Sequence, residues 1–220
     1  MSTLREDLTI ALDSVDAREK ADNTLALALH TSRGTIEALF HPCPEARAAV
    51  ICVSGVSGGM DGPSSLFDGL AQRLGRHQIA TLRLDYRRKS ILQECILDVL
   101  VGVAFLGGLG ITHIALVGHA FGGAVVIMAG AVSQQVTAVA ALASQTYGTA
   151  QVDRLAPRPL LLLHGDEDDI LPPACSEEIF RRANEAKVLV TLPATGHDFE
   201  QRAAEAERVV ASWLLDQLPS

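Results

Sequence analysis

The sequence is poor in aromatic side chains and in positive charge. Aromatic residues make up only 4% of the 220 residues, although hydrophobic residues make up 48%. The core must therefore be built from Ala, Val, Leu and Ile, a composition typical of a buried parallel sheet covered by helices on both faces. The formal net charge of −8 argues against a nucleic acid or an anionic membrane as partner, because either would repel the protein.

Cysteines are also few, and long apolar runs are missing. The four cysteines, Cys43, Cys52, Cys95 and Cys175, form no C-x-x-C pair and have no histidine nearby in ligand spacing, so no metal site is indicated. Cys52 stands in an apolar run, which favours a small buried side chain. No segment has the pattern of a signal peptide or the length of a membrane span. We expect a cytoplasmic protein, monomeric or homodimeric, that binds no membrane.

Short apolar runs alternate with helical segments along the chain. We expect strands at 24–30, 35–40, 48–54, 78–84, 113–119, 136–143, 159–164 and 187–192, and helices at about 65–76, 90–106, 121–132, 174–185 and 200–218. The polar residues 1–20 indicate a peripheral arm or a short helix. This alternation predicts a single α/β domain over residues 1–220, with a doubly wound, mostly parallel sheet of about seven or eight strands.

Such sheets bind ligands beyond the carboxyl ends of their strands, so the residues that follow each strand are candidates for chemistry. Residues 118–123 (GHAFGG) stand between an apolar strand and a helix. Gly118 and Gly122 flank Ala120 as the glycines flank the central residue of the nucleophile elbow G-x-S-x-G. A side chain on that turn points into the cleft at a helix N-terminus. Phosphate binding is the weaker interpretation, because G-x-G-x-x-G and the Walker Lys-Ser/Thr are absent.

Two further segments complete a pattern with the elbow. Residues 164–172 (HGDEDDILP) end a buried strand with an acidic loop, and residues 195–198 (TGHD) follow one strand later, before the last helix. The order of nucleophile position, acid and histidine is that of the α/β-hydrolases. With its acid loop HG-x-x-D-x-x-[VIL]-P and its Gly-His pair, the chain resembles that family. The absence of a cap insertion makes it similar to the compact, dienelactone-hydrolase-like bacterial branch.

The resemblance implies an α/β-hydrolase fold without a cap domain and a Ser-His-Asp type of mechanism. It implies hydrolysis of carboxylesters, lactones or similar small acyl substrates, with no cofactor. It assigns the acid to Asp168, with Asp166 and Asp169 as nearby alternatives, and the base to His197.

The same resemblance implies an oxyanion hole formed by the backbone N–H groups of Val56 and Phe121. Ser57, Gly58 and Tyr147 are expected to line the substrate pocket. Residues 55–59 (GVSGG) also read G-x-S-x-G, but they follow the strand after which the family places an oxyanion loop. Ser57 is therefore expected to line the cleft and not to attack the substrate.

Two other groups of polar residues are expected to be structural. His119 is next to the elbow, and the geometry of such a turn predicts that its ring points away from the cleft. The charged residues 85–88 are expected to pair with one another and not with a substrate.

Ala120 is the departure from the family pattern. A methyl group has no lone pair, so no acyl-enzyme can form there. In a serine protease, loss of the nucleophile costs about six orders of magnitude in turnover. The chain as written is therefore expected to be inactive or severely impaired by the usual route.

Three explanations for Ala120 stay open. The first is a Ser-to-Ala knockout, which predicts that the rest of the triad is intact. The second is a natural homologue in which the His197–Asp168 pair acts as a general base, in a hydrolase, lyase or cyclase. The third is a non-catalytic binding protein. The retained acid and histidine count against the third, because a site long without function should have lost them too.

Overall fold

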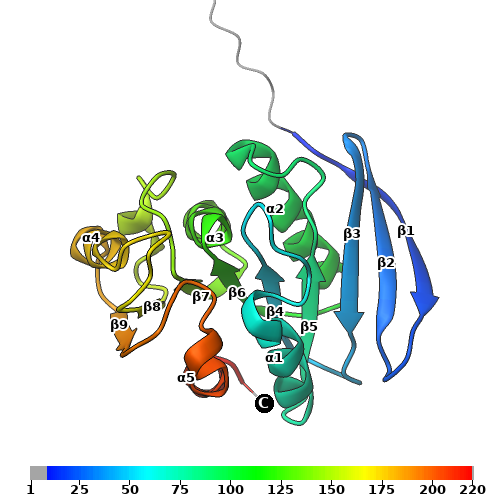
Figure 1. Ribbon diagram of the computed structural model, residues 1–220. Helices are drawn as coiled ribbons and strands as arrows, with labels where there is room; N and C mark the ends of the chain where they lie inside the picture. The colour runs from blue at the N-terminus through cyan, green and yellow to red at the C-terminus, as the bar shows by residue number, and fades with distance from the viewer. Residues whose placement is uncertain (1–8, 220) are drawn as a thin grey trace, which may run out of the picture.

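The computed structural model describes residues 9–219, which form one nine-stranded sheet with helices on both faces (Figure 1). The strand order is β1-β2-β3-β5-β4-β6-β7-β8-β9. The strands are β1 (Leu12–Glu19), β2 (Leu25–Thr31), β3 (Gly34–His41), β4 (Ala48–Val53), β5 (Ile79–Leu84), β6 (His113–His119), β7 (Val136–Leu142), β8 (Leu160–Gly165) and β9 (Lys187–Leu192). Strands β1 to β3 pair antiparallel, and β3 is antiparallel to β5. All pairs from β5 through β9 are parallel.

Five α-helices cover this sheet. Helices α1 (Leu66–Gly75) and α5 (Ala203–Gln217) lie together on one face, whereas α2 (Leu92–Gly108), α3 (Phe121–Val132) and α4 (Ala174–Arg182) lie on the other (Figure 1). Three short 3₁₀ helices occupy Pro63–Ser65 (η1), Val152–Leu155 (η2) and Glu200–Arg202 (η3). No helix within residues 9–219 is both long enough and apolar enough to cross a bilayer.

The central strands are buried on both faces, as their continuous apolar runs predict. Along β4, Ile51 and Val53 pack into the core beneath α2 and α3, whereas Val50 and Cys52 pack into the core beneath α1 and α5. Successive side chains of a strand point to opposite faces, so one strand serves both cores.

The first segment of the chain corrects one expectation. Residues 12–19, expected within an arm or a short helix, form the edge strand β1, which brings the sheet to nine strands. Its side chains are almost all exposed, so it lacks the apolar alternation that signals a half-buried strand. Residues 1–8 of the expected arm lie outside the described residues. The other strands and the helices fall where the sequence predicts, with ends shifted by a few residues.

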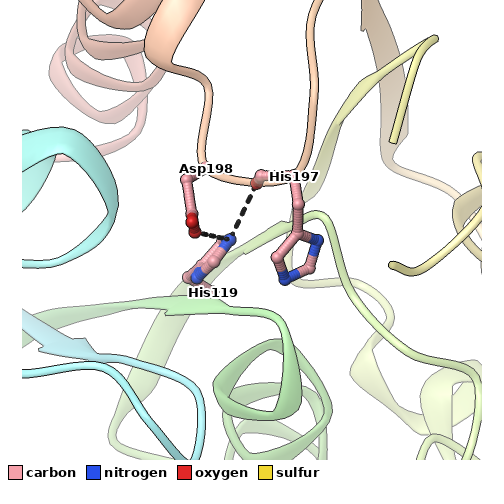
Figure 2. A group of neighbouring side chains, drawn as sticks. All are labelled: His119, His197 and Asp198. Carbon is pink, nitrogen blue, oxygen red and sulfur yellow. Dashed lines mark hydrogen bonds and ion pairs between the residues drawn. The ribbon is translucent and has the colours of Figure 1, made fainter. Parts of the chain in front are cut away.

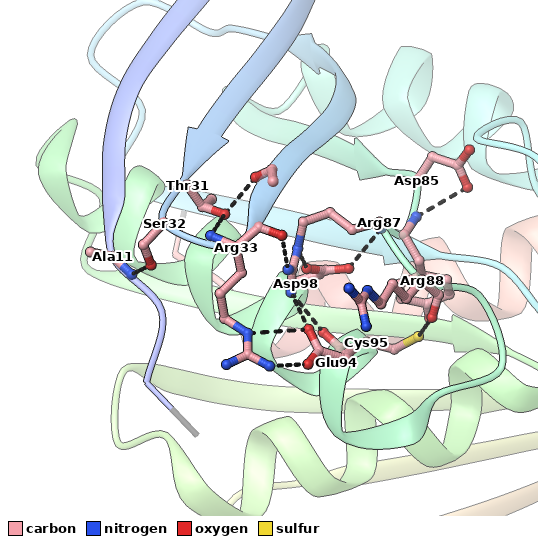
Figure 3. Close-up of polar contacts among 12 residues, drawn as sticks. Ala11, Thr31, Ser32, Arg33, Asp85, Arg87, Arg88, Glu94, Cys95 and Asp98 are labelled. Carbon is pink, nitrogen blue, oxygen red and sulfur yellow. Dashed lines mark hydrogen bonds and ion pairs between the residues drawn. The ribbon is translucent and has the colours of Figure 1, made fainter. Parts of the chain in front are cut away.

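A buried network of charges ties the β2–β3 turn to α2 (Figure 3). Arg87, which follows β5, pairs with Asp98 and with Glu94, and its Nη1 donates to the carbonyl oxygen of Arg33 at 2.9 Å. Arg33, in the β2–β3 turn, also pairs with Glu94. Buried charges are costly unless they are paired. Arg87 therefore pairs with carboxylates of α2, and not with its loop neighbours as the sequence indicated.

Candidate active site

The turn between β6 and α3 holds Ala120 in an unusual conformation, with φ of 55° and ψ of −117°. A residue with a Cβ atom rarely has a positive φ, and such strain costs on the order of 1–3 kcal/mol. The backbone on both sides fixes the turn. The N–H of Ala120 donates to the carbonyl oxygen of Leu142 at 2.9 Å, and its own carbonyl accepts from Gly123 at 3.0 Å. The sharp strand-to-helix turn predicted from the elbow pattern is therefore present.

The glycines around Ala120 are required by close backbone contacts. A Cβ atom on Gly118 would lie 2.1 Å from the carbonyl oxygen of Gly122. A Cβ atom on Gly122 would lie 2.6 Å from the carbonyl oxygens of Val53 and Ser54. Neither position has room for a side chain. These contacts are the steric reason for the G-x-x-x-G spacing, because α3 passes directly over the ends of β4 and β6.

Asp168 and His197 form a hydrogen-bonded pair. The Nδ1 atom of His197 lies 2.7 Å from Oδ2 of Asp168. The other carboxylate oxygen, Oδ1, accepts backbone N–H bonds from Ile170 at 2.9 Å and Leu171 at 2.8 Å. Burial opposes ionisation of Asp168, but these hydrogen bonds outweigh it and hold its pKa below the usual value. Asp168 is thus an ionised acceptor that orients the histidine ring.

His164 gives this carboxylate a further partner. Its Nε2 lies 2.8 Å from the carbonyl oxygen of Leu171 and 3.1 Å from Oδ2 of Asp168, and its Nδ1 lies 2.7 Å from Oγ of Ser176. Because both partners of Nε2 are acceptors, Nε2 carries the proton and Ser176 donates to Nδ1. Sequence reasoning gave His164 no role of its own, although it opens the acid-loop pattern.

The sequence matches no protein-family model and no curated protein. Solved structures do match the fold. Est1E from Butyrivibrio proteoclasticus superimposes with a TM-score of 0.77 at 20% identity, covering 87% of this chain and 98% of that one. Dienelactone hydrolase from Anabaena variabilis superimposes with a TM-score of 0.75 at 17% identity, covering 86% and 94%. The chain has the α/β-hydrolase fold.

A third solved structure is relevant to the absence of a cap domain, also called a lid. XC6422 from Xanthomonas campestris, described as an α/β serine hydrolase without a lid, gives a TM-score of 0.71 at 18% identity and covers 91% of this chain and 98% of that one. No cap domain interrupts the α/β-hydrolase fold within residues 9–219. At these identities the likeness establishes the fold.

The fold places the loop after β4 against the elbow. A Cβ atom on Gly55 would lie 3.2 Å from the Cβ atom of Ala120 and 3.9 Å from the backbone nitrogen of Phe121. Phe121 is the first residue of α3, so its N–H has no acceptor within the helix. Val56 follows Gly55 directly on the same loop. The two backbone segments predicted to form an oxyanion hole are therefore neighbours.

A cleft of about 530 Å³ opens above these groups. It is lined by Ser54, Gly55, Val56, Ser57, Gly58, Gly62, Pro63, Ser64, His119, Ala120, Phe121, Gln145, Ile170, Leu171, His197, Asp198 and Glu200. Of the eight residues expected in the site, six line it directly, and Asp168 lies behind His197. Tyr147 does not line it: its side chain is 78% exposed, and Gln145 from the same loop lines the cleft instead.

His119 corrects another expectation, because it is among the residues that line the cleft and its ring lies beside that of His197. Figure 2 shows this ring at the end of β6, beneath the loop that carries His197 and Asp198. Its Nε2 donates to the carbonyl oxygen of His197 at 3.0 Å, and the two ring centroids are 4.7 Å apart. Burial lowers the pKa of His119 to about 4, so the ring is neutral at pH 7.

Two residues with potentially nucleophilic side chains, Cys52 and Ser57, do not lie on the elbow. Cys52 is fully buried, and burial raises the pKa of its thiol to about 12, so it is core, as the sequence predicts. Ser57 is exposed on the loop after β4 and lines the cleft. Neither residue stands on the elbow, where the chain turns beneath His197.

Proposed function

We propose that the cleft is an acyl-binding site whose serine form hydrolyses carboxylesters, lactones or similar small acyl compounds. The observation that supports this most strongly is the Asp168–His197 hydrogen bond of 2.7 Å beside a strained elbow at Ala120. An oriented, carboxylate-backed imidazole next to such a turn is the arrangement that activates a hydroxyl nucleophile.

In the serine form, the hydroxyl oxygen at position 120 attacks the acyl carbon while Nε2 of His197 takes its proton. The N–H groups of Val56 and Phe121 receive the charge that develops on the carbonyl oxygen. The protonated His197 then gives its proton to the leaving alkoxide. Water hydrolyses the acyl-enzyme by the same route in reverse. Asp168 orients the ring throughout and stays ionised.

The charged residues of the cleft favour a substrate that is neutral or positively charged. Asp198 and Glu200 line the cleft, whereas no Lys or Arg is among the described residues that do so. A carboxylate on the substrate would be repelled by both side chains and would find no cationic partner there. We therefore propose short esters or lactones without an acidic group.

The test compares the chain with its Ala120→Ser variant on p-nitrophenyl acetate. The serine form should gain several orders of magnitude in kcat/KM, up to about 10⁶-fold. Replacing the acetate by the negatively charged hemisuccinate ester should lower kcat/KM of the same variant. A folded serine form that hydrolyses neither ester above the rate of the alanine form would refute the proposal.

A second candidate function is supported by the same pair. The ring of His197 is oriented by an ionised carboxylate without any help from residue 120, so it can serve as a general base towards water or towards a proton on the substrate. The chain would then be a hydrolase, lyase or cyclase in its alanine form. An activity of the alanine form that His197→Gln abolishes would support this alternative.

A further inference from the structure

Three residues that line the cleft offer ligand atoms close to one another. His119 and His197 each present a ring nitrogen and Asp198 a carboxylate oxygen, and these atoms all lie within 4.8 Å of one another (Figure 2). The Nε2 atom of His119 and Oδ1 of Asp198 are 3.8 Å apart. Two imidazoles and one carboxylate, with a further position left open, are the donor set of a catalytic zinc site.

The hydrogen bond to Asp168 prepares His197 as a ligand. It occupies Nδ1 with a proton, so Nε2 keeps its lone pair. A carboxylate behind a metal-bound histidine raises the basicity of the ligand and fixes the orientation of the ring. In this chain that carboxylate is held in turn by backbone N–H groups and by His164.

His119 and Asp198 need only local adjustment. The competitor for Nε2 of His119 is the hydrogen bond to the carbonyl oxygen of His197. A tautomer change that moves the ring proton to Nδ1 frees that atom for an ion. The side chain of Asp198 is 56% exposed and can rotate. Its backbone is held in place, because Oγ of Ser64 donates to its carbonyl oxygen at 2.8 Å.

We propose that His119, His197 and Asp198 bind a zinc ion, and that the open position of this ion holds a water molecule in place of the missing serine hydroxyl. The ligands line the same cleft as Ala120, in which we propose that an acyl substrate binds. Sequence reasoning missed this site because it considered cysteine spacing, whereas the ligands come from two segments far apart in the chain.

The chemistry that such a site supplies is hydrolysis without an acyl-enzyme, and this step rests on the proposed acyl substrate. Zinc lowers the pKa of bound water to about 7, so the water loses a proton to solvent. The hydroxide forms a bond to the acyl carbon, and the bond from that carbon to the alcohol oxygen breaks. The alkoxide takes the proton of the newly formed carboxylic acid, which leaves a carboxylate and an alcohol. One ester and one water give a carboxylate, an alcohol and a released proton.

Hydrolysis through a zinc ion and hydrolysis through a serine at position 120 cannot operate together, because both need Nε2 of His197. An ion on Nε2 prevents that nitrogen from taking a proton from a serine hydroxyl. Zinc should therefore raise ester hydrolysis by the alanine form and inhibit the Ala120→Ser variant. No common effect of zinc on stability would produce opposite signs in the two forms.

The test begins with binding. Tag-free, chelator-treated protein is titrated with Co²⁺, whose visible absorption intensifies in a four-coordinate site, and with Zn²⁺ by calorimetry. Asp198→Asn and His119→Gln should each weaken binding by about tenfold or more. Asp169→Asn, a matched change at an exposed carboxylate of the acid loop, should leave the affinity unchanged. Asp198→Asn is the deciding variant, because its side chain is largely exposed and the fold does not depend on it.

The outcomes separate the two proposals. Co²⁺ binding that is insensitive to Asp198→Asn overturns the zinc site, and ester hydrolysis by the Ala120→Ser variant would still support the acyl site. Zinc binding that is lost with Asp198→Asn supports the metal centre even where neither form hydrolyses esters, and in that case it is the acyl substrate that fails. Opposite effects of zinc on the alanine and serine forms support both.

Discussion

Nδ1 of His197 donates a hydrogen bond of 2.7 Å to Asp168, yet Ala120 has no proton to give to this pair. The acid is buried and bound by four donors, from His197, His164, Ile170 and Leu171. These hydrogen bonds fix the carboxylate of Asp168, which in turn orients the ring of His197. The elbow beneath it keeps a strained backbone although alanine makes no chemical use of it.

Removal of the carboxylate tests the role of Asp168. In the Ala120→Ser background, Asp168→Asn should lower kcat on p-nitrophenyl acetate by about 10⁴-fold, because an amide favours the wrong tautomer of His197. Asp166→Asn, at an exposed residue of the same loop, should change kcat by less than about twofold. Equal losses in the two variants would mean that Asp168 does not orient the base.

The strain at Ala120 predicts an effect on stability. Glycine adopts a positive φ freely, so Ala120→Gly should raise the free energy of unfolding by about 1 kcal/mol. The same change at Ala104, exposed on α2, should lower it by about 1 kcal/mol, because glycine is unfavourable inside a helix. Urea denaturation of both variants measures the difference. Destabilisation at both positions would show that the elbow is not strained.

The close contact of α3 with the end of β4 predicts that replacing a nearby glycine lowers the free energy of unfolding. Gly122→Ala would push a methyl group to within 2.6 Å of two carbonyl oxygens and should destabilise the protein by about 3 kcal/mol. Gly59→Ala, where no atom lies within 4 Å of the new Cβ atom, provides the control and should have little effect. Coinciding urea midpoints for the two variants would mean that the elbow can relax away from β4.

Much of the site could be predicted because its signals are local. Ala120 follows the buried strand β6 directly, Asp168 comes shortly after the buried strand β8, and His197 lies in the loop after β9. The turn residues around each of them form recognisable patterns. The side chains of α3 and of β4 to β8 are mostly buried, so the apolar runs in the sequence predicted the positions of these elements. The acid was left open among three aspartates, and only Asp168 contacts the histidine ring.

What could not be predicted depends on contacts between distant segments. The geometry of the elbow turn led to the expectation that His119 points away from the cleft. Nothing near His119 in the sequence shows that the loop at His197 folds over its ring. Tyr147 was expected in the pocket because it follows a strand, but its loop presents Gln145 instead. Strand β1 has almost no buried face, so hydrophobic periodicity could not reveal it.

The network around α2 makes stability depend on pH. The hydrogen bond from Arg33 is the largest of the interactions that hold the pKa of Glu94 below its ordinary value of 4.5. The ionised group therefore stabilises the fold above pH 4.5, and this contribution is lost as pH falls through the lowered pKa. Glu94→Gln should destabilise the protein at pH 7. The difference in the free energy of unfolding between this variant and the unaltered chain should become smaller in acid. Glu19→Gln, on the exposed strand β1, is the control.

That expectation is checked by urea denaturation of the three proteins at pH 7 and at about pH 3. A gap between Glu94→Gln and the unaltered chain that stays constant with pH would show that Glu94 acts through packing and not through its charge.

The central claim is that position 120 is a nucleophile position from which the nucleophile is missing. Mass spectrometry after treatment with a fluorophosphonate tests it most directly, because this reagent needs an activated serine but no particular substrate. We predict one adduct per molecule of the Ala120→Ser variant, located at position 120, absent from the unaltered chain and lost again on adding His197→Ala. A folded Ala120→Ser variant that stays unlabelled, or that is labelled at Ser57, would contradict the account.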